Sequence, residues 1–243
     1  MKYIKSLSLV GALFASSQSL VASDVPTGDI SAARAIVQQG EFAHINWAIT
    51  YPGIETLIDL SPDGGITPRV DVTMQARILA ADVQQRTTYT RRGRQFTSFS
   101  YIWVTSYALV NDQVARLLFN GTQPSVNPAE IVWERDLNEG ENITFASGAS
   151  FSGSRWYFSG RNDPNVLLLT DGDVPPEFTT WTTQSTLGSH ISAYLDEEGK
   201  VDIGPRDVIV VFELTHTVTP GAANNVGDFQ DLIVLLTFES EER

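Results

Sequence analysis

Two stretches, Asp207-Val-Ile-Val-Val-Phe-Glu-Leu214 and Gly227-Asp-Phe-Gln-Asp-Leu-Ile-Val-Leu-Leu-Thr-Phe238, decide the fold of this chain. Their apolar runs, Val208–Leu214 and Leu232–Phe238, are short, β-branched or aromatic, and free of Gly and Pro. Such runs are typical of strands that are buried on both faces. A loop rich in Asn, Gly and Pro joins them, so we expect an antiparallel hairpin in the middle of the fold, with Leu214 and Leu232 near its loop end.

The predicted hairpin gathers acidic residues at its loop end. Glu213, Asp228 and Asp231 lie where the two runs meet the loop, and the loop itself supplies Asn225. Calcium prefers several oxygen ligands from carboxylates, amides and backbone carbonyls, and a cation would neutralise acids that otherwise repel. We therefore predict a calcium site formed by Glu213, Asp228, Asp231 and Asn225. In the alternative interpretation, Asp228 and Asp231 only cap turns and accept backbone N–H groups.

The same region resembles a family of secreted bacterial domains of unknown function. Members of this family show Phe-Glu-Asp, a Gly/Asp loop and Asp-Phe-Asn-Asp before a last strand, and this chain has Phe212-Glu213-Leu214 and Asp228-Phe-Gln-Asp231. The likeness covers about residues 208–238. It implies an all-β extracellular module of the kind found in cell-surface or adhesin-like proteins, with Glu213, Asp228 and Asp231 facing calcium.

Three positions depart from the family pattern. Leu214 stands where the family has an acid, Gln230 where it has Asn, and Val226-Gly227 where a further Asp is common. Fewer oxygen ligands are available here than in the family.

The start of the chain predicts export. Met1-Lys-Tyr-Ile-Lys5 is basic, Leu7 to Phe14 is mostly apolar, and Val21-Ala-Ser23 offers small residues for a signal peptidase. We predict a cleaved signal peptide over residues 1–23, too short to span a membrane, and a protein that is secreted or periplasmic in a bacterium. Residues 24–243 would then form a single β-sandwich domain, with two lobes as an open alternative.

Composition narrows the range of partners. After removal of residues 1–23, 14 basic side chains face 29 acidic ones, a formal charge of −15. This charge argues against nucleic acid and against insertion in an anionic membrane. The chain has no cysteine, so its stability has to come from a large core or from bound ions rather than from disulfides.

Alternating patterns predict an all-β, jelly-roll-like sandwich with one short helix. Val70, Val72, Met74, Ala76 and Ile78 alternate with polar residues, and similar strands recur every 8–12 residues with turns between them. Helical spacing appears only at Leu187, Ile191, Tyr194 and Leu195, with Ser185 or Thr186 as a cap.

A hairpin is predicted over residues 87–99, with its turn at Arg91-Arg-Gly-Arg94. This is the basic cluster of an otherwise acidic chain. It either meets an acidic partner or keeps the tip of the hairpin soluble.

No catalytic signature is present, so we predict that the protein is not an enzyme. His44, His190 and His216 share no metal-ligand spacing, and neither Gly-x-Ser-x-Gly nor His-Glu-x-x-His occurs. The leading hypothesis is a structural or adhesive module with one calcium ion, whose partner is an extracellular protein or glycan.

Two other functions remain open. The first is a carbohydrate-binding module, with aromatic rings as the platform. The candidate rings are Tyr101, Trp103, Trp156, Tyr157 and Trp181. The second is a glycoside hydrolase, which would need two carboxylates on facing walls of a cleft.

Overall fold

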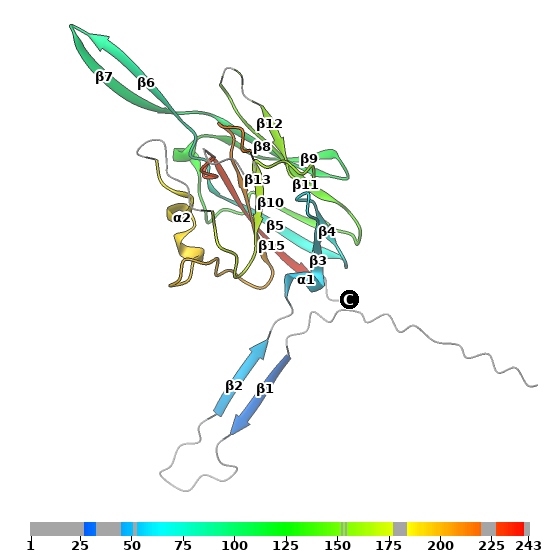
Figure 1. Ribbon diagram of the computed structural model, residues 1–243. Helices are drawn as coiled ribbons and strands as arrows, with labels where there is room; N and C mark the ends of the chain where they lie inside the picture. The colour runs from blue at the N-terminus through cyan, green and yellow to red at the C-terminus, as the bar shows by residue number, and fades with distance from the viewer. Residues whose placement is uncertain are drawn as a thin grey trace, which may run out of the picture.

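Two antiparallel sheets pack face to face in the computed structural model, which describes residues 27–32, 45–50, 53–151, 153, 155–176, 184–219 and 227–240 (Figure 1). The five-stranded sheet has the order β10 (Trp133–Leu137), β5 (Val72–Ala80), β15 (Leu232–Ser240), β14 (Asp207–Phe212) and β13 (Val166–Leu169). The other sheet has the order β3 (Ile58–Leu60), β4 (Ile66–Pro68), β11 (Ile143–Ala149), β8 (Val104–Val110) and β9 (Gln113–Gly121), with β12 (Trp156–Phe158) also paired to β11.

The predicted C-terminal hairpin is confirmed. β14 and β15 are antiparallel neighbours, with Phe212 opposite Leu232 and Asp207 opposite Thr237. β15 also pairs with β5, so it occupies the middle of its sheet.

Both faces of this hairpin are buried, which explains why apolar residues occupy nearly every position. The inward residues join a core shared by the two sheets, namely Val208, Val210, Phe212, Leu232, Val234, Leu236 and Phe238. The outward residues join a second cluster, in which Leu187, Ile191 and Val201 cover Ile209, Val211, Ile233 and Leu235. The segment that contains the predicted helix therefore closes the outer face of the five-stranded sheet.

The alternating pattern over β5 marks a strand with one face in the core, as predicted. Val72, Met74, Ala76 and Ile78 are buried, and the residues between them are half-buried. The chain passes from β5 to β8 and β9, back to β10, over again to β11 and β12, and returns to β13. This crossing between sheets agrees with the predicted all-β, jelly-roll-like sandwich.

Helical structure is shorter than predicted. The expected helix consists of one turn, α2 (Leu187–His190), followed by a 3-10 turn, η2 (Ser192–Tyr194). Thr186 is its cap, because the Ser189 N–H donates to Thr186 Oγ1 at 3.1 Å. Two further turns, α1 (Ile54–Leu57) and η1 (Gln123–Ser125), occur where no helix was expected.

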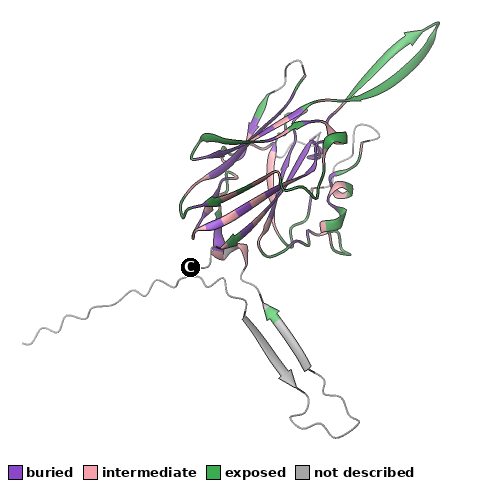
Figure 2. Ribbon diagram, turned by 180° about the vertical axis from the view of Figure 1, so that it is seen from behind, coloured by how far each residue is buried: buried purple, intermediate pink, exposed green. Residues whose placement is uncertain are grey.

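Two hairpins lie outside the paired sheets. β1 (Thr27–Ala32) pairs with β2 (Ile45–Thr50), and β6 (Gln84–Arg91) pairs with β7 (Arg94–Tyr101). The second confirms the predicted hairpin, with Arg92 and Gly93 at its tip in the left-handed region (φ 51° and 72°). We call residues 84–101 the arm, because it projects from the sandwich and is exposed along nearly its whole length (Figure 2).

Some predictions lie beyond the residues that the structure describes. These are the signal peptide over 1–23, the proposed ligand Asn225 and the aromatic residue Trp181. Within the described ranges, no helix is long and apolar enough to cross a membrane.

Candidate metal site

The C-terminal hairpin brings three carboxylates together, as its sequence predicts. β14 ends at Phe212 opposite Leu232 of β15, so residues 213–216 and 227–231 lie side by side. One oxygen from each of Glu213, Asp228 and Asp231 lies within 4.8 Å of the others, and all three side chains are buried. This buried acidic cluster could hold a metal ion.

Glu213 holds the two sides of the cluster together. Its Oε1 accepts from the N–H of Thr215 (3.0 Å), the hydroxyl of Thr215 (2.7 Å) and the N–H of His216 (2.8 Å). Its Oε2 accepts from the N–H groups of Asp228 (2.7 Å) and Phe229 (3.3 Å). Five donors from both strand ends therefore converge on one fully buried side chain, and we call this arrangement the Glu213 clamp.

Asp231 combines a turn-capping role with a place in the cluster. Its Oδ2 accepts from the N–H groups of Leu214 (2.6 Å) and Thr215 (3.0 Å). The alternative interpretation, in which acids at this loop bind backbone N–H groups, is thus correct for Asp231. Glu213 also accepts backbone N–H groups, and more of them than Asp231 does, although the alternative interpretation named only Asp228 and Asp231.

The pKa values of the three acids are shifted in different directions. Burial, and then the charge of Glu213, raise the pKa of Asp228 to about 7 and hold the pKa of Asp231 well above its ordinary range. Burial also acts against ionisation of Glu213, but hydrogen bonds from His216, Thr215 and Asp228 outweigh it and lower the Glu213 pKa. The cluster therefore has one stable anion beside two carboxyl groups that need a proton or a cation.

His216 adds a positive neighbour at the edge of the cluster. Its Nδ1 lies 2.8 Å from the Thr215 hydroxyl and 3.4 Å from Glu213 Oε1. The hydrogen bond to Glu213 raises the His216 pKa, although partial burial opposes this. The sequence gives His216 no metal-ligand spacing with the other histidines, and the structure places it beside Glu213 and Thr215 at the edge of the cluster.

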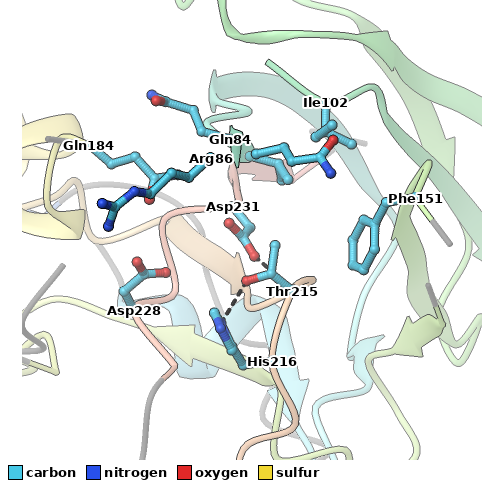
Figure 3. Close-up of a pocket in the computed structure, with 11 residues that line it drawn as sticks. Gln84, Arg86, Ile102, Phe151, Gln184, Thr215, His216, Asp228 and Asp231 are labelled. Atoms are coloured by element: carbon cyan, nitrogen blue, oxygen red, sulfur yellow. Dashed lines mark hydrogen bonds between the residues drawn. The ribbon is translucent and has the colours of Figure 1, made fainter. Parts of the chain in front are cut away.

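The cluster opens into a cavity of about 270 Å³ between the end of the sandwich and the base of the arm (Figure 3). Asp228, Asp231, Thr215 and His216 lie along one side of it. The rest of the lining includes Val83, Gln84, Arg86, Ile102, Phe151 and Gln184. This volume accommodates an ion together with several water molecules.

Two buried amides next to the acids were not predicted. Asn165 Nδ2 donates to the carbonyls of Glu213 (2.8 Å) and His216, and its Oδ1 accepts from the Val218 N–H (3.0 Å). Gln230 is fully buried, and its amide oxygen and nitrogen have no hydrogen-bond partner among the described residues. An amide buried without a partner is costly, and its oxygen is a ligand that calcium accepts.

The backbone of the cluster is strained at Phe229. This residue has φ 52°, in the left-handed region that a phenylalanine rarely adopts. Its ring is buried in the second core cluster, and its N–H donates to Glu213 Oε2. The clamp and the core together hold this turn in place.

The other candidate residues do not belong to this group of three acids. His190 pairs with the buried Asp82 at 3.3 Å on the side covered by α2. Of the aromatic candidates, Tyr157 is buried, and Tyr101, Trp103 and Trp156 are about half exposed.

Comparisons of the chain with protein-family models, curated proteins and solved structures find no match. The fold and the acidic cluster are therefore the observations on which a function has to be based. The resemblance of residues 208–238 to secreted bacterial domains stays a prediction.

Proposed function

We propose that this protein is an exported, non-enzymatic β-sandwich module with a structural or adhesive role, and that its acidic cluster holds one calcium ion. The observation that carries the proposal is the convergence of Glu213, Asp228 and Asp231 within 4.8 Å at the end of the central hairpin. Export rests on the signal peptide predicted from residues 1–23.

The donor set favours calcium over other metal ions. The cluster offers carboxylate oxygens, and hard cations prefer oxygen ligands. Zinc favours imidazole and thiolate ligands, whereas this cluster consists of three carboxylates with His216 at its edge. Magnesium demands a tighter octahedral site, whereas calcium accepts the irregular geometry of a loop.

The same geometry argues for a structural rather than a catalytic role. Both oxygens of Glu213 are already hydrogen-bonded by donors from the neighbouring backbone, which leaves them poorly placed to attack a substrate or take its proton. For the same reason Glu213 would act on an ion mainly through its charge, while Asp228 and Asp231 supply the ligand oxygens. An ion here would stabilise the loop end of the hairpin.

Calcium should raise the melting temperature of the purified protein, and a chelator should reverse the effect. At about 100 times the dissociation constant, a bound ligand adds about 2.7 kcal/mol, or roughly 5–10 °C for a chain of this size. Asp228→Asn removes one charged ligand and should weaken calcium binding in titration calorimetry by about tenfold or more.

The matched control is Asp112→Asn. Asp112 lies in an exposed turn at φ 62°, which Asn adopts readily, so calcium affinity should not change. If the wild-type protein shows neither heat of binding nor a shift in melting temperature with calcium, the calcium part of the proposal is wrong.

A specific observation also supports a second function, binding of a glycan on the outer face of the six-stranded sheet. Trp156 is 48% exposed and packs over Gly148, where an added Cβ would lie 3.3 Å from the indole. Across the sheet, Gly148 lies opposite Thr105 of β8, and Thr105 lies opposite Asn120 of β9. The Thr105 hydroxyl donates to the Asn120 amide oxygen at 3.0 Å. A flat ring beside hydroxyl and amide groups is a suitable platform for a sugar.

Trp156→Ala should remove this glycan binding. We expect about a tenfold or larger loss of affinity for neutral oligosaccharides on a glycan array, because stacking on the indole is lost. Tyr89→Ala, which removes an equally exposed ring on the arm, is the control and should bind as the wild type does. An array on which the wild type binds no glycan would rule out this second function.

A further inference from the structure

The arm has the composition and exposure of an interaction element. β6 and β7 pair with each other and, within the described part of the chain, with no other strand. Four aromatic rings on the arm are between 42% and 50% exposed, those of Tyr89, Phe96, Phe99 and Tyr101. A two-stranded ribbon is at best marginally stable alone in water, and exposed rings such as the stacked pair Tyr89 and Phe96 are typical of a surface that a partner covers.

The charge of the arm indicates what kind of partner this is. Residues 84–101 contain four Arg and no Asp or Glu, whereas the rest of the chain has 12 basic and 29 acidic side chains, a formal charge of −17. Arg91 and Arg94 stand directly opposite each other, with Arg92 between them in the turn. Like charges placed opposite each other are unfavourable, and an acidic counter-surface would offset them.

A matching surface exists on the same molecule at β10. This strand is an edge of the five-stranded sheet and pairs only with β5 among the described strands. Four exposed acids lie on it and beside it, which are Glu130, Glu134, Asp136 and Glu139, with Arg135 as the one basic residue over 128–140. We call this the acidic edge. Its free backbone groups can accept a further strand.

We propose that the arm of one copy docks on the acidic edge of a second copy of this chain, by pairing along β10. The arm points away from its own sandwich in both views, so the acceptor belongs to another molecule (Figures 1 and 2). Donor and acceptor are different surfaces, and such head-to-tail contacts generate rings or open chains of copies. The free strand edge favours a protein acceptor over a polyanion, which has no backbone to pair.

Sedimentation velocity of the purified full chain tests this proposal. The wild type should self-associate at about 100 µM in low salt, and association should weaken about tenfold at about 0.5 M NaCl, because salt screens exposed charges. Arg91→Glu with Arg94→Glu should abolish association, and so should Glu134→Lys with Asp136→Lys. An equimolar mixture of these two double variants should associate again, because each supplies the reversed surface that the other needs.

Matched controls separate the arm from a general charge effect. Arg116→Glu with Arg155→Glu reverses two exposed arginines away from the arm and should leave association unchanged. Circular dichroism of each variant checks that it is folded. A wild type that stays monomeric in low salt overturns the proposal, and this includes the case in which the arm binds only an added polyanion. Reversed variants that associate as the wild type does overturn it as well.

Discussion

Without metal, the protein should lose stability as the pH rises from about 4 to about 7. The pKa of Asp228 is raised from 3.8 to about 7 in the folded protein, so in this range the folded state holds a proton that the unfolded chain releases. The stabilisation is complete below about pH 3.8 and is lost as the pH passes about 7. With about 1.4 kcal/mol for each pKa unit, the loss is on the order of 4 kcal/mol.

The other groups of the cluster act in the same direction or outside this range. Asp231 also has a raised pKa, and His216, whose pKa is raised, adds stability that is lost above its own folded pKa. Glu213 has a lowered pKa, so its contribution is present above pH 4.5 and is lost only at lower pH.

Urea unfolding at a series of pH values, with a chelator present, measures this slope. Asp228→Asn cannot titrate and should flatten it. Added calcium should reverse the trend, because the ion replaces the protons and binds more tightly as the carboxyl groups ionise. A chelated wild type whose stability is constant or increases between pH 4 and 7 would contradict the expected protonation of the cluster.

Glu213→Gln should be the most damaging isosteric change in the site. The amide keeps the size of the side chain, but its NH₂ group must face N–H donors that now point at an oxygen, either those of Thr215 and His216 or those of Asp228 and Phe229. Buried donors left without an acceptor, together with the loss of a buried charge that they stabilise, should cost about 3–5 kcal/mol.

Denaturant unfolding at pH 7 in the presence of a chelator measures this loss without a contribution from calcium. Glu198→Gln is the matched control, because Glu198 is 73% exposed and pairs with Lys200 at the surface. If both variants unfold at the same denaturant concentration, the Glu213 clamp does not contribute to stability as the structure indicates.

The sequence alone predicts the centre of the fold because its signals there are local. Apolar residues at every position of 208–212 and 232–236 require burial on both faces, and antiparallel pairing then places Glu213 opposite Asp231 and near Asp228. The alternation over β5 and the basic turn of the arm are equally direct.

Other features depend on contacts that no local pattern contains. Asn165 meets residues 213–218 across about 50 positions of sequence, and before the structure it is only a polar residue at the start of a strand. The backbone N–H groups that bind Glu213 come from the turns at residues 215–216 and 228–229, whose shape no local pattern predicts. The helix at 187 ends after one turn, where the Ser189 and Ser192 hydroxyls donate to the Thr186 and Ser189 carbonyls, a local bond that competes with helix formation elsewhere in proteins.

The Glu213 clamp has a consequence for engineering of this protein. It fastens Thr215 and His216 on one side to Asp228 and Phe229 on the other, so both ends of the intervening connection are fixed independently of its sequence. Lengthening a connection whose ends are already held adds little to the entropy of closing it. Foreign peptides inserted after residue 219 should therefore leave the register of β14 and β15 unchanged.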